Sequence, residues 1–339
     1  MACSYLGERT DMIAVLPRSS ILSRHQWRVG EFVWLAAAIV SWFVFPEYLS
    51  LGSSILVMVI LVLSYDLVLG FSGVLSLGHA VFFGLGAYTA GWLSLSGWTE
   101  PISAVFVGSA ASALLAACIG PLVLRLTGLP VMMVTLALGV VVYEAAHKGR
   151  ALTGGEDGLT GISWAPVLGV FEWQLGGATS YLYVLAWLVL VFIAVKRVVA
   201  SPFGVMLQGV RENPARMRLL GNGVLPHLTA AYVVSGGVAG LAGTLFTQVN
   251  GFVGVGTLAI DTSVDVLVML MVGGIGQLWG ALIGAPVYML LKHFSSQWSP
   301  FYWMFLIGIL LIAVVMAGKG GLLGLFRAGV GRLASEWRR

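Results

Sequence analysis

Residues 50–69, SLGSSILVMVILVLSYDLVL, form an almost uninterrupted apolar run that is long enough to cross a lipid bilayer. A transmembrane helix needs about 20 predominantly apolar residues, because the hydrocarbon core is about 30 Å thick. The run therefore predicts a membrane-spanning helix. Its single carboxylate, Asp66, would lie within the span, where carboxylates are costly and often functional.

The composition extends this interpretation to the rest of the chain. Hydrophobic residues make up 59% of the 339 residues, and only 9% are charged. Soluble domains carry about 25% charged residues, so we expect an all-α, polytopic membrane protein with about 8–10 spans. No basic run with interleaved aromatic residues is present, and we expect no nucleic-acid partner. The two cysteines, Cys3 and Cys118, show no metal-ligand spacing.

Other apolar segments lie on both sides of residues 50–69. The segment 262–275 is short and runs into the glycines Gly273 and Gly274, so it is either a crossing or a half-helix or re-entrant segment beside a pathway. The remaining expected spans are 31–48, 76–95, 102–124, 129–147, 181–199, 228–250, 278–292 and 301–318.

The basic residues predict how the chain is oriented. Ten crossings with the N-terminus inside would place fifteen of the 18 lysines and arginines on the cytoplasmic side, and only Lys148, Arg150 and Lys292 outside. An excess of Lys and Arg marks cytoplasmic loops. We therefore expect both termini and the 200–227 loop in the cytoplasm, although the loss of one span would break this parity.

A polar, arginine-bearing island, FGVMLQGVRENPARMRLLGN, interrupts the apolar sequence at residues 203–222. Ser201-Pro202 and Asn213-Pro214 are typical helix starts, and Gly221 is a typical stop. Two short helices, over about 202–212 and 214–220, are predicted.

One face of the first short helix would be apolar and the other polar. Such an element either lies on anionic lipid or docks a partner. The apolar face would carry Phe203, Leu207 and Val210.

The chain has no recognisable nucleotide site. A Walker sequence, GxxxxGK[ST], is absent from the glycine-rich segment 148–180 and from the rest of the chain. We expect no cofactor and no metal on this chain, and we interpret 148–180 as a structured external loop.

An intramembrane serine protease is the enzymatic alternative, because Gly70-Phe71-Ser72-Gly73 matches its GxSG pattern and His147 could be offered as the base. A nucleophile and its base must lie within about 3 Å of each other. The predicted spans place Ser72 at the inner mouth and His147 at the outer end of another span, about 30 Å away. We therefore expect no catalytic residue.

Several polar or glycine residues are candidates for a translocation pathway. His79 lies among small residues, where packing and hydrogen bonding compete with a direct role. Glu144 and Asp261 could instead lie at the outer interface. The candidates are Asp66, Ser76, His79, Asp261, Asp265, Gly273 and Gly274.

Five motifs in this order resemble a known family. They are GFSGVLSLGHAVFFGLGAYTA, TGGEDGLTGI, the SPFG and RENPARMRLLG segment, VVSGGVAGLAGTLF and MVGGIGQLWGALIGAP. Together they resemble the LivM-type permease subunits of branched-chain amino-acid ABC transporters, over about residues 50–320.

The resemblance implies a bacterial inner-membrane permease that acts with other subunits. Its partners would be a second, related permease, two cytoplasmic ATP-binding subunits that hold ATP and Mg²⁺, and a periplasmic binding protein. The domain would span residues 31–320, between a disordered tail at 1–30 and a basic tail at 321–339, with 148–180 periplasmic. Residues 201–222 would be the helices that couple to the ATPase.

The resemblance also implies which residues couple. Many ABC importers carry an EAA pattern with a downstream glycine, and Glu212, Ala215 and Gly221 stand at corresponding places, interrupted by Pro214. Arg211 and Arg216 complete the candidate set.

The expected function is ATP-driven import of branched-chain or related amino acids. A urea or short-chain amide importer is an alternative, because such permeases share these motifs. A stand-alone channel or carrier is the alternative from another class.

Overall fold

The computed structural model describes residues 29–44, 46–167 and 177–298, together with residues 305, 308, 309 and 312. This part of the chain is helical and has no strand, only an isolated bridge between Leu159 and Val253. The prediction of an all-α protein is confirmed. The expected tails at 1–30 and 321–339, and most of the expected span 301–318, lie outside the described residues.

Within the described ranges, five helical segments are long and apolar enough to cross a membrane, and a bent pair brings the number to six. Fewer helices reach spanning length than the ten segments expected. The helices α2 (Val29–Val44) and α4 (Ala80–Leu95) have only 16 residues each. The long segments are α3 (Leu49–Asp66) with its π-helical continuation η3 (Leu67–Phe71), α5 (Pro101–Val123), α6 (Leu129–Lys148), α8 (Ala178–Ala200) and α11 (Val224–Asn250).

The segment before α4 explains why that helix is shorter than the expected span 76–95. Its backbone leaves the helix and is satisfied by side chains of other elements: Leu77 N–H donates to Thr135 Oγ1 at 3.1 Å, and Ala80 N–H donates to Ser263 Oγ at 2.9 Å. Irregular backbone at membrane depth needs such cover from protein.

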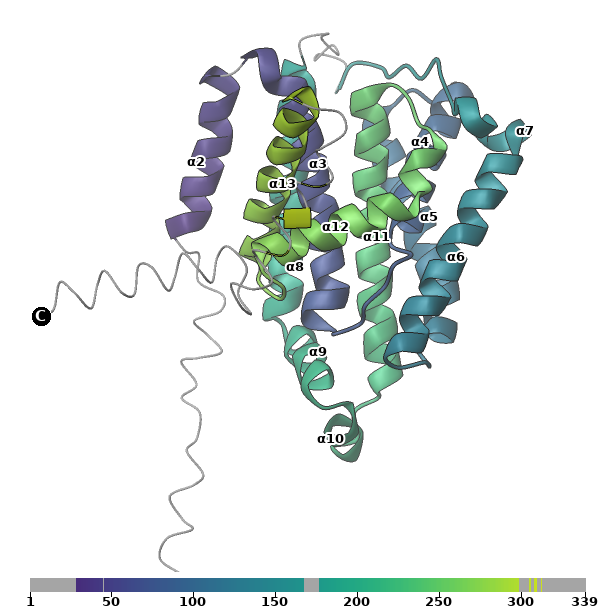
Figure 1. Cartoon of the computed structure of the whole chain (residues 1–339), viewed down its shortest axis with the longest axis vertical. Helices are drawn as coiled ribbons and strands as arrows, with labels where there is room; N and C mark the ends of the chain where they lie inside the picture. The colour runs from purple at the N-terminus through teal and green to yellow at the C-terminus, as the bar shows by residue number, and fades with distance from the viewer. Residues whose placement is uncertain are drawn as a thin grey trace, which may run out of the picture.

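The helix α11 lies at the centre of the bundle and packs against α3, α4 and α5 (Figure 1). Small residues let these helices approach closely; a Cβ added at Gly236 of α11 would lie 2.7 Å from Ala116 Cβ of α5. Hydroxyls join the same helices, since Ser112 Oγ donates to Phe82 O at 2.9 Å and Thr247 Oγ1 donates to Ala87 O at 3.0 Å.

The last two described helices, α12 (Ile260–Gly273) and α13 (Leu278–Trp298), are bent by 115° at the break 274–277. Figure 1 shows α12 lying across the long helices rather than along them. The interpretation of 262–275 as a half-helix or re-entrant segment therefore describes it better than a full crossing.

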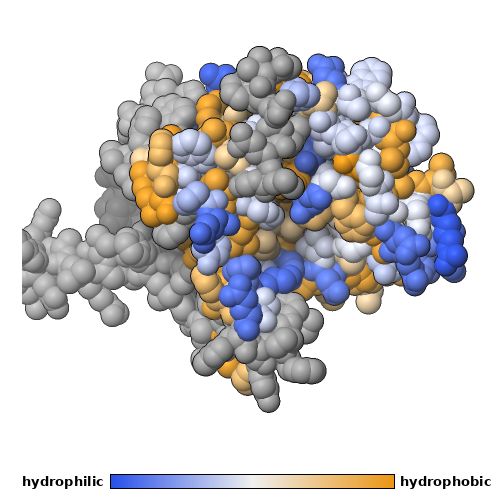
Figure 2. Space-filling view, turned by 90° about the horizontal axis from the view of Figure 1, so that it is seen from above, coloured by the Kyte–Doolittle hydropathy of each residue, from blue (hydrophilic) through white to orange (hydrophobic). Residues whose placement is uncertain are grey.

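The two ends of the bundle carry different elements. The short helices α9 (Pro202–Glu212) and α10 (Pro214–Leu219) lie at one end, and α7 (Arg150–Thr153) lies at the other (Figure 1). Seen from the α7 end, hydrophilic residues gather on the face among hydrophobic ones (Figure 2).

Candidate functional site

The polar island folds into two consecutive helices, as predicted from its start and stop residues. In α9, Leu207 and Val210 are buried and Phe203 is half-buried, so the predicted apolar face is confirmed. This face packs α9 against α8 and α11. The segment is therefore anchored to the bundle rather than hanging as a free loop.

The helix boundaries arise from different local contacts. Asn213 Oδ1 accepts a hydrogen bond from Arg216 N–H at 2.9 Å, which caps α10. Ser201 stands at the N-cap position of α9 but gives no side-chain cap, because its hydroxyl donates back to Val198 O at the end of α8, at 2.6 Å. Gly221 follows α10 with a φ of +80°, the left-handed backbone of a helix stop.

The outer side of the two helices is exposed and mixed in character. Glu212, Ala215 and Arg216 are exposed, as is Gly221. Two leucines, Leu219 and Leu220, are also exposed, at 90% and 69%. Leucines beside arginines form a surface suited to a protein partner or to lipid.

Arg211 differs from the other coupling candidates because its guanidinium reaches the bundle. Its Nη1 donates to the carbonyl oxygen of Gly70, in η3. Two further glycines border the side chain: an added Cβ would lie 2.9 Å from Arg211 Cγ at Gly73, and 2.8 Å from Arg211 Nη1 at Gly276. An added Cβ at either glycine would therefore require the Arg211 side chain to shift.

Asp66 ends α3 one turn before Gly70 and is fully buried. Its Oδ1 accepts a hydrogen bond from Gly276 N–H at 2.8 Å, and its Oδ2 has no partner among the described residues. The sequence placed Asp66 in a pathway and Arg211 in a docking element. The structure brings both to the break between α12 and α13, which begins at Gly274.

His79 and Ser76 lie in a buried cluster between α3 and α4. His79 Nε2 and Ser64 Oγ are 2.8 Å apart, and the His79 ring packs against Tyr65 with centroids 5.1 Å apart. Ser76 is fully buried beside Tyr65 and Tyr232. No group of three metal-ligating side chains occurs in the described part of the chain. Packing and hydrogen bonding account for His79 here, and a role in a pathway stays a prediction.

Asp265 joins α12 to α13 across their bend. Its Oδ2 accepts from Lys292 Nζ at 2.7 Å, and its Oδ1 accepts from the Tyr288 hydroxyl. Asp261, by contrast, lies exposed in the first turn of α12, and Gly273 packs against Gly280 at the end of that helix. The sequence missed the ion pair, although its two residues carry opposite charges on adjacent apolar segments.

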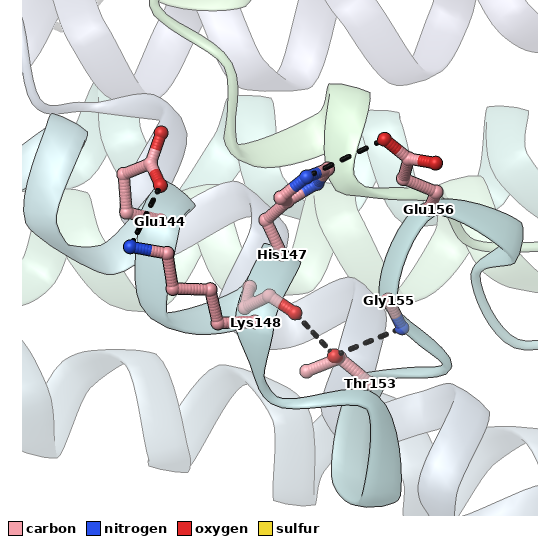
Figure 3. A network of polar contacts seen from close by, with 7 residues as sticks. Glu144, His147, Lys148, Thr153, Gly155 and Glu156 are labelled. Carbon is pink, nitrogen blue, oxygen red and sulfur yellow. Dashed lines mark hydrogen bonds and ion pairs between the residues drawn. The ribbon is translucent and has the colours of Figure 1, made fainter.

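A polar network orders the start of the segment 148–180 (Figure 3). His147 Nε2 lies 3.4 Å from Glu156 Oε1, and Lys148 Nζ lies 3.7 Å from Glu144 Oε2. Thr153 Oγ1 donates to the Ala146 carbonyl and accepts from Gly155 N–H. Residues 148–167 thus form a structured loop, and residues 168–176 lie outside the described part.

Ser72 and His147 do not form a nucleophile–base pair. Ser72 Oγ donates to Leu67 O, and its neighbour Gly73 lies against Arg211 of α9. His147 lies in the last turn of α6, beside α7 at the opposite end of the bundle (Figure 1). The geometry of an intramembrane serine protease is therefore absent for these two residues.

Comparison with known proteins identifies the family. Residues 48–315 match the family of the permease component of the branched-chain amino acid transport system. The chain is 27% identical over 322 residues to the high-affinity branched-chain amino acid transport system permease protein LivM of Salmonella typhimurium, which covers 86% of this chain and 75% of the relative. It is also 27% identical over 290 residues to LivM of Escherichia coli, covering 78% and 67%. No solved structure matches the chain. The family match extends over most of the chain, which therefore belongs to the branched-chain amino acid transport permeases.

Proposed function

We propose that this chain is the permease subunit of a binding-protein-dependent ABC importer in the bacterial inner membrane. It moves branched-chain or related amino acids into the cytoplasm. Membership of a permease family supports this proposal, as do the relatives, whose names describe high-affinity branched-chain amino acid transport.

Energy for import comes from partner subunits. The sequence carries no Walker motif, so ATP and Mg²⁺ bind on two cytoplasmic ATP-binding subunits rather than on this chain. A second, related permease completes the membrane part, and a periplasmic protein delivers the amino acid. In such a system the receptor contributes strongly to substrate choice.

The α9–α10 segment is the docking element for the ATPase. One observation carries this assignment: two helices project at one end of the bundle, anchored by Leu207 and Val210 and exposing Leu219, Leu220 and charged residues. A rigid, amphipathic element can transmit closure of an ATPase dimer into rocking of the bundle, which opens a central site alternately to each side.

The test is transport by the complete complex in proteoliposomes. We expect leucine, isoleucine or valine uptake that requires ATP inside and the binding protein outside. Glu212→Gln and Arg216→Gln should leave membrane insertion normal and should abolish substrate-stimulated ATP hydrolysis. Glu47→Gln, which removes an exposed carboxylate outside the docking element, serves as the matched control.

The same preparation separates the alternatives. If substrate stimulates ATP hydrolysis normally in both the Glu212 and the Arg216 variant, the docking assignment is wrong. Contact with the lipid surface would then be the role of these helices. Amino-acid flux through this chain alone would indicate a carrier or channel. Uptake of urea or short-chain amides, without uptake of amino acids, would change the substrate class.

A further inference from the structure

We propose that Arg211 is a positioning residue that links α9 to the break between α12 and α13 through Gly70 of η3, whose carbonyl oxygen it binds, and that this contact, the clasp, keeps the break closed. The inference rests on the proposed function in one respect, that an ATPase docked on α9 is what displaces this helix. The contact itself is a property of this chain.

Three segments that are far apart in the sequence meet at this clasp. Arg211 Nη1 donates to Gly70 O, 141 residues away, and Asp66 Oδ1 accepts from Gly276 N–H, 210 residues away. A Cβ at Gly276 would lie 3.1 Å from Gly70 O. The end of α3, the end of α9 and the break thus form one junction.

The carbonyl oxygen of Gly70, just after α3, is free of helical hydrogen bonding and can accept a hydrogen bond from Arg211. In a continuing α-helix, Val74 N–H would donate to Gly70 O. Here Val74 N–H donates to Val68 O at 3.0 Å, within the wider turns that follow Asp66. Gly70 O is thereby released from the helical ladder, and wide turns of this kind are frequent at functional sites.

Asp66 adds a second hydrogen bond beside the same glycines. It is fully buried, and its Oδ1 accepts from Gly276 N–H at 2.8 Å. Hydrogen bonds to charged groups are stronger than those between neutral groups. Asp66 thus holds the backbone of the break, and Arg211 holds Gly70 beside it.

The position of Arg211 in α9 makes the clasp responsive to movement. Arg211 lies in the last turn of α9, next to Val210, which anchors the helix in the bundle. A rigid shift of α9 moves the guanidinium relative to Gly70 and Gly276 without first deforming a long span. Arg216 and Arg218 of α10 are exposed, as is Arg211 of α9, but among the described residues only Arg211 of these three donates a hydrogen bond from its guanidinium to another helix.

The first experiment measures the break in the full-length chain alone, in lipid nanodiscs. Ile275→Cys in a Cys3→Ser, Cys118→Ser background reports the accessibility of the break to a soluble maleimide. We expect Arg211→Gln to raise the labelling rate about tenfold, equivalent to about 1.4 kcal/mol in the closing equilibrium. Arg211→Lys, which keeps a charged donor, should stay within about threefold of the parent.

Matched controls separate the clasp from general destabilisation. Arg218→Gln removes the same charge from exposed α10 and should leave labelling unchanged. Gly276→Ala should raise labelling as Arg211→Gln does, because its Cβ would lie against Arg211 Nη1. Gly161→Ala is its control, since Gly161 has a φ of +77° against +76° at Gly276 but nothing within 4 Å.

Equal labelling of Arg211→Gln and Arg218→Gln would overturn the proposal. Equal labelling of Gly276→Ala and Gly161→Ala would also overturn it. This glycine pair tests the proposal in case Arg211→Gln does not fold. In the complete transporter, amino-acid uptake per ATP hydrolysed should fall about tenfold in Arg211→Gln. If the parent complex imports no amino acid, the proposed function is wrong. The labelling experiment on the chain alone would still test the clasp.

Discussion

Replacing Asp66 tests how much the junction at the break depends on one buried carboxylate. Asp66 is fully buried, and Gly276 N–H donates to its Oδ1 at 2.8 Å. Asp66→Ala removes the acceptor and leaves the partly buried Gly276 N–H without this partner, which costs about 1–3 kcal/mol. Asp66→Asn keeps an oxygen that can accept this hydrogen bond and replaces the other oxygen by an NH₂ group.

The two variants should therefore separate in thermal unfolding. For a chain of this size, 1 kcal/mol corresponds to a shift of about 2 °C, so Asp66→Ala should lower the midpoint by about 2–6 °C. Asp66→Asn should lower it by less than half as much. Intrinsic tryptophan fluorescence of the purified chain in nanodiscs, followed during heating, measures both midpoints.

A second buried polar residue of α3 supplies the control. Ser53 is fully buried, but its hydroxyl donates within its own helix, to Leu49 O at 2.9 Å. Ser53→Ala should change the midpoint by about 1 °C or less, because it leaves no group on another element unpaired. If Asp66→Ala and Asp66→Asn unfold at the same temperature, the hydrogen bond to Gly276 contributes nothing and the reasoning is refuted.

Two further predictions concern contacts between helices. Gly236→Ala should lower the unfolding midpoint by about 2–6 °C, because overpacking costs about 1–3 kcal/mol and its Cβ would lie 2.7 Å from Ala116 Cβ. Gly256→Ala, with nothing within 4 Å, should not lower it. A double-mutant cycle of Asp265→Asn and Lys292→Met should give a coupling of about 0.5–1.5 kcal/mol, since the 2.7 Å ion pair is only partly exposed. Strict additivity of the two changes would show that this pair does not hold α12 to α13.

The elements that sequence reasoning placed well are those decided by local chemistry. The spans around α3, α5, α6, α8 and α11 follow from the length of apolar runs. The boundaries of α9 and α10 follow from the proline and asparagine that start them and the glycine that stops them. Both signals are contained within about one helix length of sequence.

The elements that sequence reasoning misjudged depend on distant partners. Residues 76–79 fall within the expected span 76–95, yet Thr135 and Ser263 satisfy the backbone around them in a non-helical form. The Ser201 hydroxyl could cap α9, but it bonds to the preceding helix instead. Composition alone could not rank these alternatives, because each depends on which helix lies alongside.

The junction at the break joins residues that the sequence singled out one by one, although it did not indicate that they meet. Asp66 was notable for its depth, Arg211 for its cytoplasmic charge and Gly274 for the interruption of an apolar segment. Each signal is local, whereas the contact that joins them closes across 141 and 210 residues. A glycine can be recognised in a sequence, but the side chain for which it leaves room cannot. Gly73 and Gly276 leave room for Arg211, and Gly70 leaves room for Asp66 and for the backbone of Gly276, so replacing any one of the three should disturb the same equilibrium at the break.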